Sequence, residues 1–211
     1  MIVDKIQRAV EEGKYSCGIF LDLSKAFDTV NHSILLKKLE FYGVRGVAKD
    51  WFYSYLSNRK QFVSIGNTVS QHKVITCGVP QGSVLGPLLC LIYINDIKYC
   101  SNVFDFHLFA DETNLFYANK NLSVLEHTVN THLDKVSTWL VCNKLSLIIE
   151  KTNYTIFHTP QKKKVYNLNI YINDKEIKVE KEVKYLGVYI DQHLNSVLTR
   201  PRHCGIPAVN K

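Results

Sequence analysis

The stretch Phe106-His107-Leu108-Phe109-Ala110-Asp111-Glu112-Thr113-Asn114-Leu115-Phe116-Tyr117 places two adjacent carboxylates inside a segment that otherwise has the character of a strand. Residues alternate in polarity and bulk on both sides of the acids, so the pattern predicts a β-hairpin with the acids at its tip. Two like charges side by side are costly unless cations neutralise them, and divalent ions with oxygen ligands are the usual solution. An ordinary solvated turn is the alternative, because acidic residues are common at turns.

Asp22 is a further carboxylate in an apolar setting, within the stretch Cys17-Gly18-Ile19-Phe20-Leu21-Asp22-Leu23. An acid in such a strand is expensive unless it is paired, hydrogen-bonded or bound to a cation. A two-metal site of the polymerase type needs a carboxylate of this kind from a strand next to the acidic hairpin. A hydrogen-bonded structural aspartate is the alternative interpretation.

The charge balance of the 211-residue chain favours a polyanionic partner. There are 26 Lys and Arg residues against 19 Asp and Glu, for a net charge of +7 and a pI near 9.0. Nucleic acid is the partner that such a balance most often indicates. The hydrophobic content of 46% supports a folded core, and the length allows one domain with a small appendage.

The sequence gives no sign of a membrane segment or of a disulfide framework. The longest apolar run, residues 84–94, contains Gly86 and Pro87, and the first residues carry acids where a signal peptide would be apolar. The six cysteines lie far apart, with no CxxC pair, so we expect reduced thiols. We therefore expect an intracellular protein without a membrane partner, in the nucleus or the cytoplasm.

Hydrophobic periodicity predicts alternating helices and strands along the chain. The aromatic residues of the expected helix 47–56 are interpreted as core residues, with a base-stacking platform as the alternative. A capping box at Ser123-Val124-Leu125-Glu126 predicts the start of a long helix that covers the sheet. Helices are expected at 2–12, 35–42, 47–56, 85–92 and 123–140, and strands at 17–23, 61–65, 74–77, 145–150, 153–158, 165–172 and 176–191.

The segment Gly78-Val79-Pro80-Gln81-Gly82-Ser83 combines flexible backbone with one amide side chain before an apolar helix. Glycines let main chain approach a ligand closely, while the amide of Gln81 can make a directed contact. A simple loop that ends in a helix cap at Ser83 is the alternative.

Taken in order, these blocks resemble the palm of reverse transcriptases, and most closely those of non-LTR, LINE-type, jockey-like retrotransposons. The resemblance covers residues 14–194 and rests on several motifs rather than one. The matching stretches are Phe20-Leu21-Asp22-Leu23-Ser24-Lys25-Ala26-Phe27-Asp28 (motif A), residues 78–87 (motif B), Phe109-Ala110-Asp111-Glu112 (motif C), residues 144–147 with 150–152 (motif D) and Tyr185-Leu186-Gly187-Val188.

The resemblance implies an α+β polymerase palm in which an antiparallel sheet packs on helices and the acids of motifs A and C meet. It implies template-directed addition of dNTP to a primer 3′-hydroxyl, with an RNA template, a DNA primer and two Mg²⁺ ions that Mn²⁺ could replace. The implied catalytic and metal-binding residues are Asp22, Asp111 and Glu112.

The other roles are carried over from the resemblance position by position. Phe27 stands where the family places the bulky side chain that excludes a 2′-hydroxyl, and Lys151 where a cation would lie near the triphosphate. The implied nucleotide-binding residues are Leu23, Phe27, Gln81, Gly82 and Lys151, and the implied primer grip is Tyr185, Leu186 and Gly187.

Three departures from the family pattern leave a second interpretation open. Glu112 replaces the usual second aspartate, the chain starts only 21 residues before Asp22, and the sequence after Leu194 no longer resembles the family. We therefore expect a truncated copy with a palm at residues 1–194, few fingers elements, no thumb, and an unrelated or disordered tail at 195–211. Other retroelement segments would supply fingers and thumb, and the alternative function is a weak or inactive remnant that at most binds nucleic acid.

Overall fold

A five-stranded sheet forms the centre of the protein. The computed structural model describes residues 2–80, 82–109, 112–162, 168–194 and 197–198. The strand order is β11-β8-β1-β7-β6, and every neighbouring pair is antiparallel except β11 with β8. The strands are β1 (Tyr15–Asp22), β6 (Asp105–Phe109), β7 (Glu112–Asn119), β8 (Asn153–Phe157) and β11 (Lys178–Val179). The expected α+β class, with a mainly antiparallel sheet packed on helices, is confirmed.

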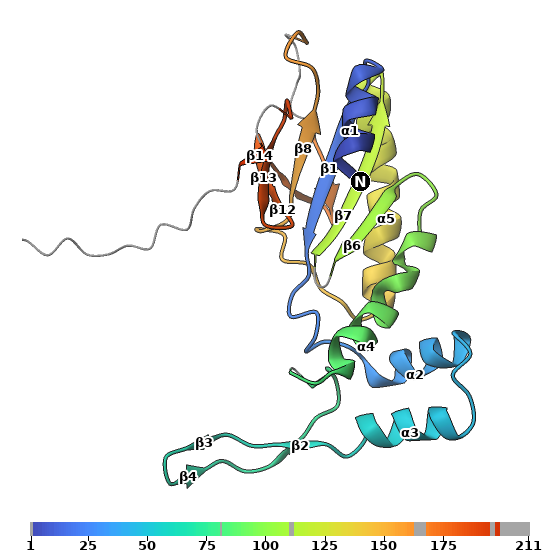
Figure 1. Cartoon of the computed structure of the whole chain (residues 1–211), viewed down its shortest axis with the longest axis vertical. Coiled ribbons are helices and arrows are strands. Elements are labelled where there is room, and N and C mark those ends of the chain that lie inside the picture. Colours follow the sequence, from blue (N-terminus) through green and yellow to red (C-terminus); the bar gives the residue numbers. More distant parts are fainter. Residues whose placement is uncertain (1, 81, 110–111, 163–167, 195–196, 199–211) are drawn as a thin grey trace, which may run out of the picture.

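The two faces of the sheet belong to two separate hydrophobic clusters, because strand side chains point alternately to opposite faces. Ile19 and Leu115 pack on the face covered by α5 (Leu122–Cys142), whose residues Val129, Leu133, Val136 and Leu140 are all buried. Phe20 and Phe116 pack on the other face, against α1 (Ile2–Glu11) and the hairpin of β12 (Glu182–Tyr185) and β13 (Val188–Asp191). Figure 1 shows α1 and α5 running alongside the sheet.

A group of helices and a projecting hairpin form the lower part of the molecule (Figure 1). The helices are α2 (His32–Phe41), α3 (Val47–Leu56), α4 (Leu85–Ile94) and the 3-10 helix η1 (Asn95–Tyr99). We call residues 59–75 the arm. Its short strands are β2 (Lys60–Gln61), β3 (Ser64–Ile65), β4 (Thr68–Val69) and β5 (Lys73–Val74), with β2 paired to β5 and β3 to β4.

Two-residue turns close the hairpins near the C-terminus. Asn173 and Asp174 both have positive φ between β9 (Tyr171–Ile172) and β10 (Lys175–Glu176), which is the geometry such turns require. A further strand, β14 (Val197–Leu198), pairs with β13. The expected division at residue 194 stays a prediction, and most of 195–211 lies outside the described residues.

Several local predictions differ from the structure. The single strand expected at 176–191 is divided into β11, β12 and β13. The long helix begins at Leu122 rather than at the capping box, because the Asn121 side chain accepts hydrogen bonds from the Ser123 and Val124 amides. Residues 145–150 form no named strand, since only Leu147 bridges to Leu23 before the chain turns. The interpretation of the α3 aromatics as core is wrong for Trp51, which is 51% exposed.

Within the described ranges, no helix combines the length and the apolar character needed to cross a membrane. The most apolar helix, α4, has only 10 residues. A membrane-spanning helix needs about 20.

Gly18 provides a test of how tightly the sheet packs. A Cβ atom at this position would lie 2.8 Å from Phe116 Cε1 and 3.0 Å from Phe157 Cε2. We predict that Gly18→Ala lowers the free energy of unfolding by about 1–3 kcal/mol, as overpacking usually does. Phe116→Leu should relieve part of that cost, so chemical denaturation of the double variant should show a favourable coupling. Strictly additive effects of the two changes would contradict this packing.

Candidate active site

The register between β1 and β7 brings two carboxylates together at the end of the sheet. Asp22, the last residue of β1, is the partner of Glu112, the first residue of β7. Partners across antiparallel strands have Cα atoms about 4.5–5.5 Å apart, with their side chains on the same face of the sheet. Glu112 also pairs with Phe109 of β6, so β6 and β7 form the predicted hairpin. Residues 110–111 lie outside the described residues, and with them the predicted ligand Asp111.

The segment after α5 holds the Asp22 end of β1 in place. The Asp22 amide donates to Thr152 Oγ1 at 3.3 Å, and the Asp22 carbonyl accepts from the Ile148 amide at 2.9 Å. The Ser24 amide donates to the Ser146 carbonyl at 2.8 Å. Motif D is therefore anchored to motif A by main chain and one buried hydroxyl.

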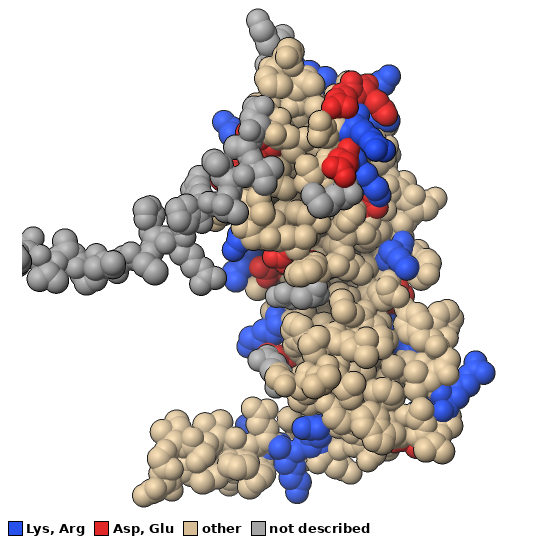
Figure 2. Space-filling view, viewed as in Figure 1, with Lys and Arg blue, Asp and Glu red and all other residues tan. Residues whose placement is uncertain are grey.

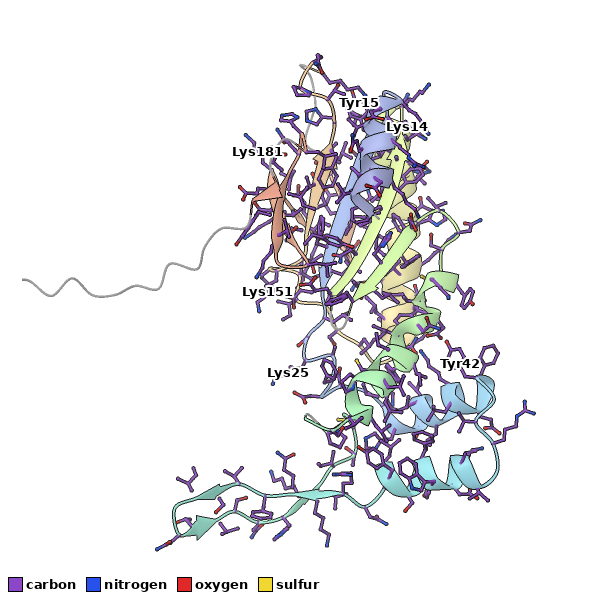
Figure 3. The ribbon with its side chains drawn as sticks, viewed as in Figure 1. Lys14, Tyr15, Lys25, Tyr42, Lys151 and Lys181 are labelled. Carbon is purple, nitrogen blue, oxygen red and sulfur yellow. The ribbon has the colours of Figure 1, made fainter. Side chains whose placement is uncertain are left out.

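The hydrogen bond between Asp22 and Thr152 also fixes the backbone position of the directly preceding residue, Lys151. Its side chain is exposed, and Figure 3 shows Lys151 and Lys25 on the same edge of the molecule, near the lower end of β1. Thr152 is fully buried, and its anchoring role was not predicted from the sequence. The feature of the sequence that could have indicated this role is a hydroxyl residue directly before a strand of apolar character.

Tyr185 lies next to the acidic pair. Burial and the nearby negative charge of Glu112 raise the pKa of the Tyr185 phenol above its ordinary value. Its ring packs edge-on against Phe116, with ring centroids 6.4 Å apart. Asp22, Glu112, Phe20 and Phe116 share the sheet face that the β12–β13 hairpin covers, so this hairpin closes one side of the site.

The turn between β12 and β13 consists of Leu186 and Gly187, with φ of 49° and 84°. This is a tight two-residue turn, and a leucine in the left-handed region is uncommon. Of the predicted primer-grip residues, Leu186 and Gly187 thus form an exposed turn, and Tyr185 directly precedes it.

The segment after Asp22 packs against the start of motif B. The Val79 amide donates to the Phe27 carbonyl at 2.8 Å, and the Gly78 amide to the Val30 carbonyl at 2.7 Å. Gly78 has a φ of +86°, and a Cβ there would lie 2.8 Å from the Asp28 carbonyl oxygen. Only glycine allows this approach, so Gly78 fixes the distance between the two motifs.

The rest of motif B is described in part. Ser83 Oγ accepts from the Gly86 amide, as the helix-cap interpretation expects, while Gly82 is exposed with a φ of +79°. Gln81 lies outside the described residues. The Leu23 side chain is buried in the core. The predicted contact of Leu23 with a nucleotide would therefore have to come from its main chain.

The raised pKa of Tyr185 gives a direct test of its distance from Glu112. A raised folded-state pKa stabilises the fold below the unfolded value near 10, and this stability is lost as the pH rises through the folded value. We predict that Glu112→Gln lowers the pKa of Tyr185 but leaves it above the ordinary value, because burial is the larger cause. The measurement is a pH titration followed by NMR of ¹³Cζ-labelled tyrosine, with Tyr185→Phe for assignment and Glu126→Gln as the control. An unchanged pKa in Glu112→Gln would show that the two side chains are apart.

The comparison with protein families gives one match over most of the chain. The family described as "Reverse transcriptase (RNA-dependent DNA polymerase)" matches residues 1–190. The chain is 28% identical over 205 residues to a probable RNA-directed DNA polymerase from transposon BS of Drosophila melanogaster, covering 90% of this chain and 21% of that protein. It is 28% identical over 204 residues to the RNA-directed DNA polymerase from mobile element jockey of the same species, covering 92% and 21%. The chain thus spans about a fifth of the length of these relatives.

Solved structures show the same fold. Telomerase from Candida tropicalis, solved in complex with a fragment of telomeric RNA, superposes with a TM-score of 0.62 at 12% identity, covering all of this chain and 34% of that one. Apo telomerase from the same species, truncated from its C-terminal domain, gives a TM-score of 0.61 at 13% identity, covering 94% and 38%. Together with the match over residues 1–190, the motifs in order and the paired acids at the sheet end, these similarities show that the chain belongs to the reverse transcriptase family, with relatives among the non-LTR retrotransposon polymerases.

Proposed function

We propose that this chain is the palm of an RNA-directed DNA polymerase, which adds dNTPs to a primer 3′-hydroxyl as directed by an RNA template. The observation that carries the proposal is the register that sets Asp22 opposite Glu112 at one end of the sheet. Two carboxylates in that position are an unfavourable pair unless cations join them.

The donor set at this end of the sheet fits magnesium. Carboxylate oxygens are the ligands that Mg²⁺ prefers, and Mn²⁺ takes the same ligands. Among the described residues no group of three or more His, Cys, Asp or Glu side chains is placed to hold a metal ion. The proposed third ligand is Asp111, beside Glu112 in sequence. Asp22, Asp111 and Glu112 would hold two ions, which when bound activate the primer hydroxyl and stabilise charge on the leaving pyrophosphate.

The surrounding residues would position the substrates. Phe27 stands against motif B through its carbonyl, where its ring would exclude a 2′-hydroxyl and thus select dNTP over NTP. Lys151 would add a positive charge near the triphosphate, as its exposed place beside the Asp22 anchor allows. Leu23, Gln81 and Gly82 complete the proposed nucleotide-binding set.

Tyr185, Leu186 and Gly187 would contact the primer end from the β12–β13 turn. Within this set, Tyr185 is the residue whose pKa is raised, by burial and by the negative charge of Glu112. A primer end held there would lie beside the carboxylates that act on its hydroxyl.

A polymerase palm would need fingers and thumb segments as well as nucleic-acid partners. Because the relatives are about five times longer, we propose that other retroelement segments supply fingers and thumb. The substrates are intracellular compounds, which agrees with an intracellular site of action. The net charge of +7 suits an RNA template and a DNA primer.

Primer extension tests this proposal most simply. On a poly(rA) template with an oligo(dT) primer, dTTP and Mg²⁺, we predict incorporation that Asp22→Asn lowers by two or more orders of magnitude, because a metal ligand is lost. Asp134→Asn, which removes an equal charge from an exposed position of α5, is the matched control and should leave the rate unchanged. Incorporation that survives Asp22→Asn would exclude this carboxylate from the chemistry.

A second candidate function follows from Glu112. Glutamate is longer than aspartate by one methylene, and magnesium demands near-ideal octahedral geometry at about 2.0–2.1 Å. A misplacement of about 1 Å can reduce a rate about a hundredfold. The chain would then be a retroelement remnant that binds nucleic acid. Binding of primer and template without incorporation would favour this alternative.

A further inference from the structure

A basic cleft lies where the arm leaves the body of the protein. It has a volume of about 710 Å³, and we call it the arm cleft. One wall comes from the base of the arm and the other from motif B and the end of motif A. Arg59 and Lys60 line it on the arm side, and Asp28, Gly78 and Val79 on the other side.

Positive charge dominates this region. The sequence contains no Asp or Glu between Asp50 and Asp96, whereas Arg59, Lys60 and Lys73 fall inside that interval. All three side chains belong to exposed residues, and the ion pairs of the described part of the chain include none of them. Figure 2 shows basic side chains gathered at the base of the arm. Asp28, on the wall that faces the arm, is the acidic residue among the described residues that line the cleft, so the arm side keeps an excess of positive charge that suits an anionic ligand.

A row of stacked groups runs from the cleft along α3. The Arg59 guanidinium lies over the Tyr55 ring, 5.3 Å from its centroid. Tyr55 in turn stacks on Trp51, with centroids 5.4 Å apart and an interplanar angle of 11°. Trp51 ends the row with half of its surface exposed, although Phe52 packs edge-on to its ring with centroids 5.0 Å apart, so the exposed part of the indole is what a planar ligand could contact.

We propose that the arm cleft binds an unpaired nucleic-acid strand, with its phosphodiesters on Arg59 and Lys60 and a base stacked on Trp51. Binding sites for single strands combine cations along the backbone with aromatic platforms for bases. The row extends away from the cleft one helical turn at a time, so it serves neighbouring units of a polymer better than one small anion. The inference rests on the proposed function only for the identity of that strand, which is the template on its way to the acids.

The position of the cleft supports this role. Gly78 and Val79 line it, and their amides donate to the carbonyls of Val30 and Phe27, at and just beyond the end of motif A. A nucleic-acid strand that contacts Val79 in the cleft is therefore separated from Phe27 by Val79 alone. Binding there would guide the strand toward the proposed nucleotide site without contact with the acidic pair.

The test is binding of a short fluorescein-labelled oligo(U), measured by fluorescence anisotropy over a salt series without divalent metal or dNTP. Each phosphate contact to a single strand adds about 0.7 to the slope of log K against log salt. We predict that Arg59→Gln/Lys60→Gln lowers this slope by about 1.4 and the affinity roughly tenfold at about 0.1 M salt. Trp51→Ala should lower the affinity by a similar factor and leave the slope unchanged, because stacking releases no counterions.

The matched control is Lys98→Gln/Lys135→Gln, which removes two charges from exposed residues of η1 and α5. Equal losses in the two double variants would mean that only net charge matters and would overturn the proposal. A second experiment measures the binding of inorganic triphosphate by calorimetry. Loss of triphosphate binding in Arg59→Gln/Lys60→Gln, with oligo(U) binding unchanged, would assign the cleft to nucleotide phosphates and also overturn it.

The outcome is independent of catalysis, because the assay contains neither metal nor dNTP. Oligo(U) binding that depends on the arm cleft, together with a failure of primer extension, would contradict the proposed polymerase activity alone. Normal extension with oligo(U) binding indifferent to Arg59 and Lys60 would contradict the arm cleft alone.

Discussion

The pairing register of β1 with β7 is the constraint on which the rest of the structure depends. It runs without interruption from Tyr15 opposite Asn119 to Asp22 opposite Glu112. A shift by one residue would turn every side chain of β1 to the other face of the sheet. Ile19 would then leave the cluster under α5, and Asp22 would face that apolar layer instead of Tyr185. The packing of the core and the placement of the acids are therefore specified together.

The other parts of the site are attached to the end of β1 by main-chain hydrogen bonds. Ile148 and Thr152 hold Asp22 from one side, while Gly78 and Val79 hold the segment that follows it. Main-chain contacts of this kind depend on backbone position more than on side-chain identity. This is one reason why solved structures at 12–13% identity can share the fold.

The sequence predicted those features that depend on local pattern. The acidic hairpin, the buried strand that ends at Asp22 and the α3 helix at 47–56 all follow from periodicity, and the structure confirms them. The turn at Asn173 and Asp174 was also predictable, because these residues tolerate positive φ.

Features that depend on tertiary contacts were harder to predict. The alternation at 145–150 resembles a strand, but Ile148 and Ser146 spend their hydrogen bonds on single contacts to the motif A segment. Asn121 caps the helix in place of the predicted capping box, because its side chain, one residue before the helix, accepts hydrogen bonds from two amides of the first turn. Trp51 has the spacing of a core residue, yet half of its surface is exposed.

The candidate site was predictable only in part, for a similar reason. The motifs indicated that the acids of motifs A and C meet at adjacent strand ends, with Asp22 near Asp111. The register sets Asp22 opposite Glu112, while Asp111, Gln81 and the roles of all the site residues stay predictions. The role of Thr152 could not be read from the sequence, since a hydroxyl gains its meaning from the amide it meets 130 positions away. The electrostatic link between Glu112 and Tyr185 likewise depends on how the β12–β13 hairpin folds over the sheet.

The central claim is that the acids at the end of β1 and β7 form a divalent-cation site. Substoichiometric Mn²⁺ added to the ¹⁵N-labelled protein tests it directly, because the paramagnetic ion broadens amide signals close to where it binds. The account predicts selective broadening of Asp22, Leu23 and Thr113, which disappears in Asp22→Asn and persists in Asp134→Asn. Broadening centred elsewhere, or the same pattern in Asp22→Asn, would contradict it.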